Sequence, residues 1–343
     1  METKLFKINS IYENPDELEQ AAQILARGGL VAFPTETVYG LGANGLNADA
    51  VRAIYQAKGR PSDNPLILHI CDLEMLPQLA REVPEAAVKL AMAFWPGPLT
   101  MVLPKTDQVP DVVSGGLDTV AIRFPSHLIA RELIRRSQKP IAAPSANLSG
   151  SPSPTTAQHC IDDLMGRVDA IVDGGSCGVG LESTVVSLAG EIQTVLRPGG
   201  VTVEQLREVL GEVRVDPAVT HPMAQGQKAA SPGMKYKHYA PKAKVILVEA
   251  DQDAFCQYVN ANKKPGVFAL CFSEDVPDLQ VPVVCYGGQT HPEQQAHALF
   301  DALRRLDQEK AELVYAHCPS QQGVGLAVYN RLLRAAAFDL VEL

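Results

Sequence analysis

Apolar residues change their spacing repeatedly along the first part of the chain, which predicts alternating helices and strands. Over residues 16–27, apolar side chains recur at helical spacing, with Asn14 as a cap, Pro15 in the first turn and glycines at 28–29 as the stop. Further helices are predicted over 84–94, 127–137, 156–164 and, after Asn47 and up to Gly59, over 48–57. Strands are predicted over 30–33, 66–70, 100–103, 119–124, 170–172, 183–188 and 194–196, and leading into Ala142. This alternation indicates an α/β fold built on a twisted, mixed and largely buried sheet.

The chain changes character between residues 216 and 233, where Pro, Gln, Gly and Ala follow one another without a clear period. We interpret this stretch as part of an interdomain linker. Beyond it, apolar runs separated by helical patterns predict strands over 245–248, 266–271, 281–285 and 313–316. These elements indicate a smaller, doubly wound, Rossmann-like α/β domain. The predicted organisation is a first domain over 1–213, a linker or lid over 214–241 and a C-terminal domain over 242–343.

Composition agrees with two globular domains and narrows the class of protein. The 343 residues exceed what one hydrophobic core usually organises, and the formal net charge of −9 argues against a dedicated nucleic-acid binder. The sequence shows neither a signal peptide nor a run long and apolar enough to span a bilayer, so we expect a cytoplasmic protein. The seven cysteines include no CxxC pair, and we expect reduced, mostly buried thiols rather than disulfides or a zinc site.

One glycine-rich segment, from Gly40 to Gly45, matches the GxGxxG pattern of dinucleotide-binding folds. Polar residues separate its glycines from the preceding strand, the next helix begins only after Asn47, and no acidic residue stands at the end of a second strand. We therefore interpret the segment as a glycine-rich turn at which the backbone approaches a ligand or a neighbouring segment.

Polar motifs follow several of the predicted strands, and functional groups of α/β folds gather at such strand ends and loops. The motifs are PTETVYG at 34–40, KGRP at 58–61, NPLILH at 64–69, TVAIRFP at 119–125, APSAN at 143–147, ESTV at 182–185 and RPG at 197–199. They contain the cations Lys58, Arg60, Arg123 and Arg197 in an otherwise acidic protein. With the hydroxyl and amide groups nearby, these cations suit a triphosphate and a carboxylate.

Each of these residues also has an ordinary explanation when it is taken singly. Lys58 ends a predicted helix, where a cation is favourable, and arginines such as Arg60 suit surface ion pairs. Ser145 and Asn147 are typical turn or cap residues, and a histidine such as His69 in an apolar strand is usually a satisfied core residue. The functional hypothesis therefore depends on the joint occurrence of the motifs.

Taken together, the motifs resemble the YrdC/Sua5 family of threonylcarbamoyl-AMP synthases. KGR at 58–60 and SAN at 145–147 look like the family's KxR and SxN signatures, and the similarity runs over residues 29–199. The length of the chain and the segment SPGMKYKHYAP at 231–241 are similar to the two-domain Sua5 type, in which this linker folds back over the active site. The resemblance thus implies a YrdC-like domain followed by a smaller Sua5 C-terminal domain.

The resemblance implies that L-threonine, bicarbonate and ATP react to give threonylcarbamoyl-AMP and pyrophosphate, which is a nucleotidyltransferase reaction. A downstream tRNA threonylcarbamoyl transferase would then form N6-threonylcarbamoyladenosine in ANN-decoding tRNAs, so we expect no stable nucleic-acid binding by this chain. The implied threonine-binding residues are Thr37, His69, Arg123, Ala143 and Ser183. The implied ATP-binding residues are Lys58, Arg60, Asn64, Thr119, Ser145, Asn147, Ser153, Arg197 and Tyr239. Lys58 and Arg60 are the predicted catalytic residues because they would neutralise charge as pyrophosphate leaves, and Mg²⁺ is expected on the ATP phosphates rather than in a protein cage.

The linker motif, with Tyr239, Lys235 and Lys237, predicts a lid that reaches the nucleotide and excludes water from a labile adenylate. The simpler alternative is a plain linker with solvated lysines. Two other functions stay open. One is a carbamoyltransferase acting on a carbamoyl-adenylate, as in hydrogenase-maturation relatives, although nothing here resembles their acylphosphatase or zinc-finger parts. The other is an RNA-binding or ribosome-maturation module without catalysis.

Overall fold

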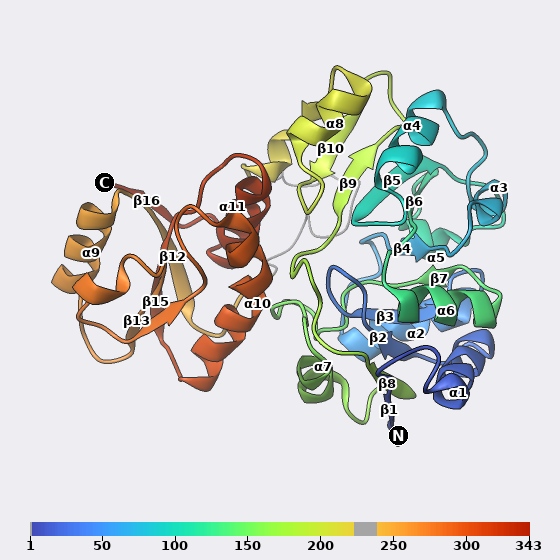
Figure 1. The fold of residues 1–343 in the computed structure, drawn as a ribbon, viewed down its shortest axis with the longest axis horizontal. Helices are drawn as coiled ribbons and strands as arrows, with labels where there is room; N and C mark the ends of the chain where they lie inside the picture. Colours follow the sequence, from blue (N-terminus) through green and yellow to red (C-terminus); the bar gives the residue numbers. More distant parts are fainter. Residues whose placement is uncertain (1, 223–238) are drawn as a thin grey trace.

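The computed structural model describes residues 2–222 and 239–343, and two separate β-sheets organise them. The larger sheet has eleven strands and the smaller has five. Figure 1 shows the smaller sheet and its helices beside the larger part of the molecule, which holds the N-terminus. The predicted fold class, a mixed α/β sheet followed by a smaller α/β unit, is therefore confirmed. The residue boundaries assigned to the domains stay a prediction.

The larger sheet draws its strands from the whole first part of the chain. In spatial order they are β1 (Lys4–Lys7), β8 (Ala170–Asp173), β2 (Val31–Phe33), β3 (Gly40–Asn44), β7 (Ile141–Ala142), β4 (Ile67–His69), β6 (Thr119–Arg123), β5 (Leu99–Pro104), β9 (Thr184–Ser187), β10 (Thr194–Arg197) and β11 (Arg214–Val215). The sheet is mixed, since β4 runs parallel to β6 and antiparallel to β7. Its helices are α1 (Pro15–Ala26), α2 (Ala48–Lys58), α3 (Leu76–Leu79), α4 (Glu85–Phe94), α5 (Asp111–Ser114), α6 (Leu128–Ser137), α7 (Ala157–Leu164) and α8 (Val203–Leu210), with 3-10 turns η1 (Leu73–Met75) and η2 (Pro217–Val219).

Helix α2 begins and ends at the residues that its sequence predicts. The side chain of Asn47 accepts hydrogen bonds from two backbone N–H groups of the first turn at 3.0 and 3.2 Å, and Gly59 ends the helix with a left-handed φ of 62°. Helix α1 also starts where expected, but Asn14 does not cap it, because its side chain accepts a hydrogen bond from the backbone N–H of Asn9 at 3.1 Å. The well-defined end of α2 determines where Lys58 leaves the helix.

The glycine-rich segment forms strand β3, so the prediction of a turn at this position is wrong. The strand pairs in antiparallel fashion with β2 and β7. A Cβ atom at Gly42 would lie 2.5 Å from the ring of Phe33 and 2.8 Å from the side chain of Ile141. The absence of a side chain therefore lets the neighbouring strands pack their own side chains onto β3, and this close approach explains the glycine there.

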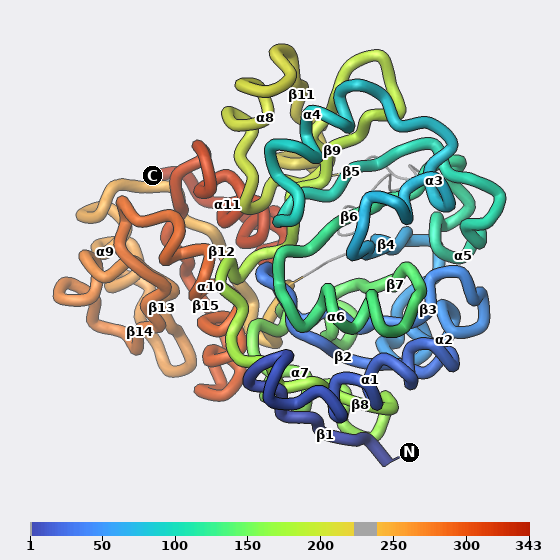
Figure 2. The backbone as a smooth tube through the Cα atoms, turned by 45° about the vertical axis from the view of Figure 1, so that its right-hand side comes forward, coloured from blue at the N-terminus to red at the C-terminus, as the bar shows by residue number. Residues whose placement is uncertain are grey.

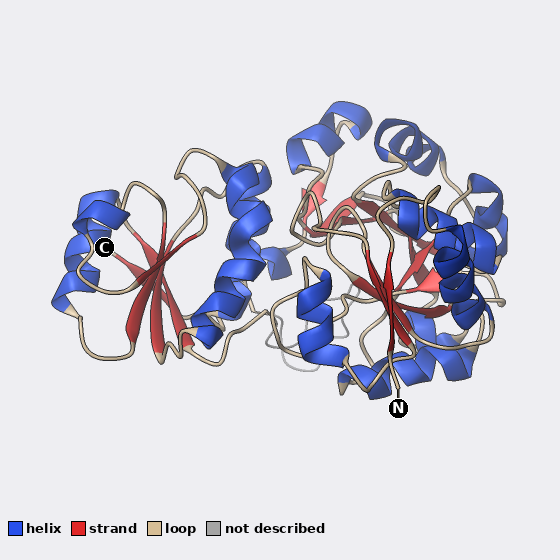
Figure 3. Ribbon diagram, turned by 60° about the horizontal axis from the view of Figure 1, so that its bottom comes forward, coloured by secondary structure: helices blue, strands red, loops and turns tan. Residues whose placement is uncertain are grey.

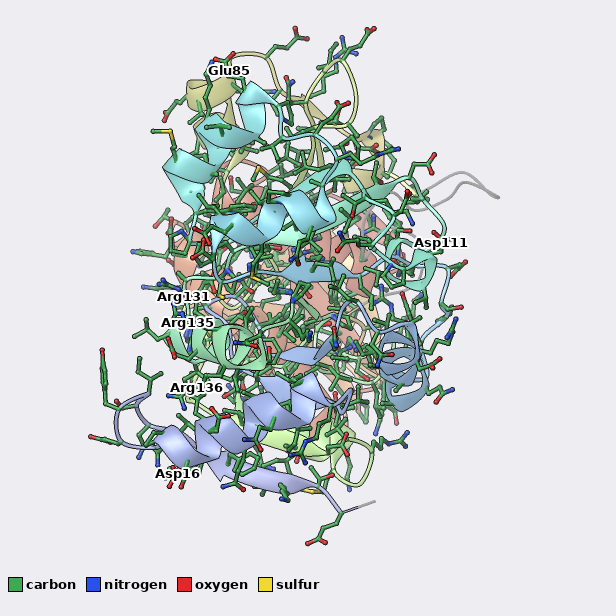
Figure 4. All side chains as sticks on the ribbon, turned by 90° about the vertical axis from the view of Figure 1, so that its right-hand side faces the viewer. Asp16, Glu85, Asp111, Arg131, Arg135 and Arg136 are labelled. Atoms are coloured by element: carbon green, nitrogen blue, oxygen red, sulfur yellow. The ribbon has the colours of Figure 1, made fainter. Side chains whose placement is uncertain are left out.

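Helices α1 and α6 lie side by side on the larger part, as Figure 4 shows. Their apolar faces share one buried cluster with side chains of β1, β2 and β8. At the rim of this cluster, Arg136 of α6 donates a hydrogen bond to the backbone oxygen of Pro15 at 2.9 Å and lies 3.6 Å from the carboxylate of Glu19. The apolar stripe predicted for the first helix is thus its buried face.

The smaller sheet is entirely parallel. In spatial order its strands are β14 (Val283–Cys285), β13 (Val267–Cys271), β15 (Leu313–His317), β12 (Lys244–Glu249) and β16 (Leu340–Glu342). The connecting helices are α9 (Gln252–Ala261), α10 (Pro292–Gln308) and α11 (Val324–Ala335), with one 3-10 turn η3 (Val276–Asp278). Figure 3 shows helices on both faces of this sheet, with α9 on one side and α10 and α11 on the other. This is the doubly wound arrangement that the sequence predicts.

Helices α10 and α11 face the larger part and contact it directly (Figures 1 and 2). Arg304 of α10 forms an ion pair with Asp163 of α7 at 2.8 Å, and both side chains are largely buried. The backbone of Gly180 approaches α10 so closely that a Cβ atom would lie 2.5 Å from the Cα atom of His297. The C-terminal unit is therefore packed tightly against the rim of the larger one.

All seven cysteines lie in the described part of the chain, where they form no disulfide and five are buried. The expectation of free, mostly buried thiols is confirmed. Within residues 2–222 and 239–343, no helix combines the length and the apolar composition that crossing a bilayer requires.

Candidate active site

A cavity of about 660 Å³, counted with the solvent at its mouth, lies at strand ends of the larger part. Its lining residues are Thr35, Thr37, Val38, Gly40, Lys58, Arg60, Ile67, His69, Arg123, Ala143, Pro144, Ser145, Asn147, Ser149, Glu182, Ser183, Arg197 and Tyr239. The four predicted cations all belong to this set, and each is less than one-tenth exposed. Such burial excludes the simpler explanation of the arginines as members of surface ion pairs.

The Lys58 ammonium group is held by the loop that follows β7. Its Nζ donates a hydrogen bond to the backbone oxygen of Ser145 at 2.6 Å and another to the backbone oxygen of Asn147. The Ser145 hydroxyl donates to Oδ1 of Asn147 at 2.6 Å, while Nδ2 of Asn147 donates to the backbone oxygens of Leu148 and Ser151. The serine and asparagine do shape a turn, as their types suggest, and that turn binds the lysine.

The two cations at the end of α2 lie in a poorly solvated environment. Burial, followed by repulsion from Arg60, lowers the pKa of Lys58 to about 7. Burial likewise lowers the pKa of Arg60, whose guanidinium donates a hydrogen bond to the backbone oxygen of Pro65 at 3.2 Å and lies 5.7 Å from the ring centroid of Tyr55. An anion entering the cavity would stabilise the charged form of both side chains.

Arg123 lies at the centre of a second buried group, at the end of β6. Its Nη1 donates a hydrogen bond to the hydroxyl of Thr37 at 2.9 Å, and its Nη2 lies 2.8 Å from the carboxylate of Glu36. Burial opposes ionisation of Glu36, but its attraction to Arg123 prevails and holds the pKa of that carboxyl below its usual range. Burial and the same arginine lower the pKa of His69 to about 3, so this imidazole is neutral, and its Nδ1 has no hydrogen-bond partner among the residues that the structure describes. A neutral histidine and a guanidinium thus lie together on this side of the cavity.

The loops before β9 and after β10 form the third side of the cavity. Arg197 donates hydrogen bonds through Nε to the backbone oxygen of Ser183 at 3.0 Å and through Nη2 to the hydroxyl of Ser183 at 3.2 Å. Beside them, one carboxylate oxygen of Glu182 accepts a hydrogen bond from the Ser153 hydroxyl, and the other lies 2.9 Å from Nε of Arg331 in α11. The C-terminal unit therefore reaches a residue that lines the cavity.

Gly199 lies where these two loops touch. A Cβ atom there would lie 2.4 Å from the backbone nitrogen of Thr184 and 2.6 Å from the backbone oxygen of Glu182. We expect Gly199→Ala to push the loops apart and to lower the free energy of unfolding by about 1–3 kcal/mol, as overpacking does. Thermal unfolding measures this effect, and Gly178→Ala is the matched control because a Cβ atom at Gly178 meets no described residue within 4 Å. Equal melting temperatures for the two variants would contradict the close packing.

Tyr239, at the described end of the predicted lid, lines the cavity. It is buried, its φ is 64°, and its ring centroid lies 5.2 Å from that of Phe300 in α10 and 5.7 Å from the guanidinium carbon of Arg331. Lys235 and Lys237, the other two residues of the predicted lid, lie outside the described residues.

Eleven of the fourteen predicted site residues line the cavity, and three do not. Ser153 contacts the lining residue Glu182 instead, and Thr119 is half-buried at the start of β6. Asn64 is fully buried, and within residues 2–222 and 239–343 neither of its amide atoms has a hydrogen-bond partner. The predicted set omitted Glu182 and Thr35, although both belong to motifs that the sequence already indicated. The individual binding and catalytic roles stay predictions.

These features define the chain as an α/β protein with a cavity at its strand ends that is lined by four buried cations. No group of three or more His, Cys, Asp or Glu side chains among residues 2–222 and 239–343 is arranged to hold a metal ion.

Comparison with known proteins places this fold and cavity in one family. A model described as "Telomere recombination", for Sua5, YciO and YrdC proteins, matches residues 23–199, and a model of the threonylcarbamoyl-AMP synthase C-terminal domain matches residues 201–337. The threonylcarbamoyl-AMP synthase of Pyrococcus abyssi is 48% identical over 94% of each chain, and that of Bacillus subtilis is 47% identical over 96% of this chain and 95% of the relative. The crystal structure of P. abyssi Sua5 complexed with L-threonine has a TM-score of 0.90 and 43% identity, with 100% of each chain covered. The chain therefore belongs to the Sua5/YrdC family of threonylcarbamoyl-AMP synthases.

Proposed function

We propose that the chain is an L-threonylcarbamoyladenylate synthase, a nucleotidyltransferase that converts L-threonine, bicarbonate and ATP into threonylcarbamoyl-AMP and pyrophosphate. The observation that carries this proposal is one cavity lined by four buried cations and by the hydroxyl groups beside them. A buried cation is costly unless it meets a negative charge, so such a cavity favours a ligand with several anionic groups. A triphosphate together with an amino-acid carboxylate fits this requirement. That a P. abyssi Sua5 structure holds L-threonine supports the assignment of the amino acid.

Different side chains of the cavity suit different parts of the substrates. On the Arg123 side, the guanidinium offers a partner for the threonine carboxylate, and the hydroxyls of Thr37 and Ser183 offer further hydrogen bonds. At the end of α2, Lys58 and Arg60 offer charge to the phosphates. The reaction then requires that the threonine amine face the nucleotide.

The chemistry needs positioning and charge stabilisation rather than a protein nucleophile. The threonine amine takes up bicarbonate as a carbamate with loss of water. A carbamate oxygen then attacks the α-phosphorus, and the bond to the β-phosphate breaks to release pyrophosphate. Lys58 and Arg60 would stabilise the charge that develops on the leaving pyrophosphate.

Mg²⁺ enters this proposal as part of the substrate MgATP. Among the described residues, Glu182 is the carboxylate that lines the cavity, and both of its oxygens already have partners in Ser153 and Arg331. A cavity of this composition suits an ion that is bound mainly by phosphate oxygens and water.

The product would be consumed by a transferase that moves the threonylcarbamoyl group to a tRNA adenosine. An acidic chain with a net charge of −9 suits a synthase that hands on a small adenylate rather than one that holds the tRNA itself.

Pyrophosphate release from ATP by the purified protein tests the proposal, with threonine and bicarbonate each present or omitted. Release that requires both would support the synthase. ATP binding without threonine-dependent release would favour the carbamoyltransferase alternative. RNA binding that needs no ATP and weakens steeply with salt would favour the RNA-binding alternative.

The lowered pKa of Lys58 predicts the pH dependence of the reaction. Because the free protein loses the Lys58 proton as the pH rises through about 7, the charge that attracts ATP disappears above this value. We expect kcat/KM for ATP to fall by up to about tenfold per pH unit above neutrality, and Lys58→Arg to remove this alkaline limb because an arginine stays protonated. A pH–rate profile of kcat/KM checks both statements, and a wild-type profile that stays level through the alkaline range would contradict the assignment.

A further inference from the structure

We propose that Arg331, which α11 of the C-terminal unit contributes, is a positioning residue of the cavity that fixes the two loops carrying Ser183 and Arg197. This inference rests on the proposed function and assigns to the C-terminal unit a specific part in substrate binding. Arg331 does not line the cavity itself, so it would act through the residues that do.

The contacts of Arg331 join both loops to one guanidinium group. Its Nε lies 2.9 Å from Oε2 of Glu182, its Nη2 donates to the backbone oxygen of Glu182 at 3.3 Å, and its Nη1 donates to the backbone oxygen of Pro198 at 2.8 Å. The Arg331 side chain is completely buried. A planar guanidinium with several donors in a fixed fork can hold three acceptors at once, which an ammonium group cannot do with the same geometry.

The residues next to Glu182 and Pro198 are predicted to bind the substrates. Glu182 precedes Ser183, and Pro198 follows Arg197, so each loop is fixed one residue away from a predicted binding side chain. Ser183 and Arg197 are in turn hydrogen-bonded to each other. A shift of either loop would therefore move both binding groups together.

The charges around Glu182 explain why the loss of Arg331 would disturb Arg197 in particular. Burial raises the pKa of Glu182, but the charges of Arg331 and then Arg197 outweigh it and hold the pKa below its usual range. Without Arg331, Arg197 would be the remaining arginine whose charge stabilises the buried Glu182 carboxylate. We expect Arg197 to turn toward Glu182 and away from Ser183 and the ligand.

General attachment of the two units does not require these particular contacts. Arg334, one turn further along α11, donates to the backbone oxygen of Ala218 at 2.7 Å, and Ala218 does not line the cavity. Arg304 likewise contacts Asp163 and the backbone oxygen of Pro152. Among the described residues, these two arginines attach the units through acceptors other than Glu182 and Pro198.

The test compares Arg331→Lys with Arg334→Met in the full-length protein, by steady-state pyrophosphate release and thermal unfolding. We expect Arg331→Lys to raise KM for threonine and for ATP roughly tenfold. Loss of a residue that supports a binding side chain typically weakens affinity by about 10- to 100-fold, and this is the lower end of that range. We expect Arg334→Met to leave KM for threonine within about twofold while lowering the melting temperature. Unchanged KM values for Arg331→Lys, with a lower melting temperature, would overturn the proposal and leave Arg331 a purely structural residue.

A second comparison covers the case in which Arg331→Met does not fold because it leaves the Glu182 carboxylate unpaired. The double variant Glu182→Gln with Arg331→Met buries no unpaired charge, and Glu182→Gln alone is its reference. In this background Arg331→Met still removes the hydrogen bonds to the backbone oxygens of Glu182 and Pro198, so we expect KM for threonine to rise by at least about threefold. A KM equal to that of Glu182→Gln alone would contradict the positioning role.

A binding measurement separates this inference from the proposed function. Isothermal titration of threonine into the wild-type protein and Arg331→Lys needs no turnover. Absence of threonine-dependent pyrophosphate release by the wild type would refute the proposed function alone. A roughly tenfold weaker threonine affinity of the variant would then still support the positioning role, and equal affinities would overturn it.

Discussion

Replacement of Lys58 with alanine should reduce threonine-dependent pyrophosphate release by about a thousandfold, to or below the detection limit of the assay, while the chain stays folded. The expected loss is large because Lys58 is a desolvated charge in the cavity, where few water molecules screen it from the phosphates that we propose it binds. The variant should fold because burying the charged lysine opposes folding. The native pKa of Lys58 lies below the value in an unfolded chain, so its charge destabilises the native state at and below pH 7.

The matched control for this experiment is Lys89→Ala. Lys89 is a half-exposed lysine of α4 that pairs with Glu85 on the molecular surface, where Figure 4 labels the glutamate. The Lys89→Ala variant should retain full activity.

The Arg60→Ala variant should lose activity as Lys58→Ala does. Substantial activity in either cavity variant, with an unchanged melting temperature, would show that the cation concerned is not required for the chemical step.

The second large effect is expected at Arg123, where lysine should raise KM for threonine roughly 10- to 100-fold and leave KM for ATP within about twofold. Lysine keeps the positive charge that Glu36 needs, so the buried carboxylate stays paired. It loses the planar fork that contacts Thr37, Glu36 and the incoming carboxylate together. Initial-rate measurements that vary each substrate in turn separate the two KM values.

Arg131→Lys is the matched control for Arg123→Lys. Arg131 lies on the neighbouring helix α6, with its guanidinium carbon 5.3 Å from the ring centroid of Phe124, and it does not line the cavity. The Arg131→Lys variant should have the same KM values for threonine and ATP as the wild type. If Arg123→Lys raised both KM values equally, Arg123 would support the cavity as a whole rather than bind threonine.

Elements with local end signals were predictable from the sequence almost to the residue. Helix α2 carries Asn47 at its start and Gly59 at its end, and both act as expected. Helix α8 has an equally clear signal, a capping box between Thr202 and Gln205, although the predicted helices did not include it. Strands β1 and β16 carry little signal, because they are short edge strands with mostly exposed or half-exposed side chains.

The composition of the cavity could be predicted only from the joint motifs. Lys58 and Ser145 are 87 residues apart, and no local pattern brings them together. At β3, by contrast, a local pattern was present but misleading. The glycines suggested a turn, whereas close packing against Phe33 and Ile141 of the neighbouring strands favours a strand. In the sequence, nothing distinguishes Arg331 from an ordinary polar residue of an amphipathic helix. Its burial depends on the packing of α11 against the larger part of the molecule.

The ion pair between Glu182 and Arg331 has a consequence for how the protein is made. Its partners are 149 residues apart, so at about 5–20 residues per second the ribosome adds Arg331 roughly 7–30 s after Glu182. During that interval the nascent first domain must keep a carboxylate next to its cavity without its final partner. If Arg331 positions these loops, the cavity reaches its final geometry only near the end of translation, and a chain truncated before α11 should bind threonine more weakly than the full-length chain.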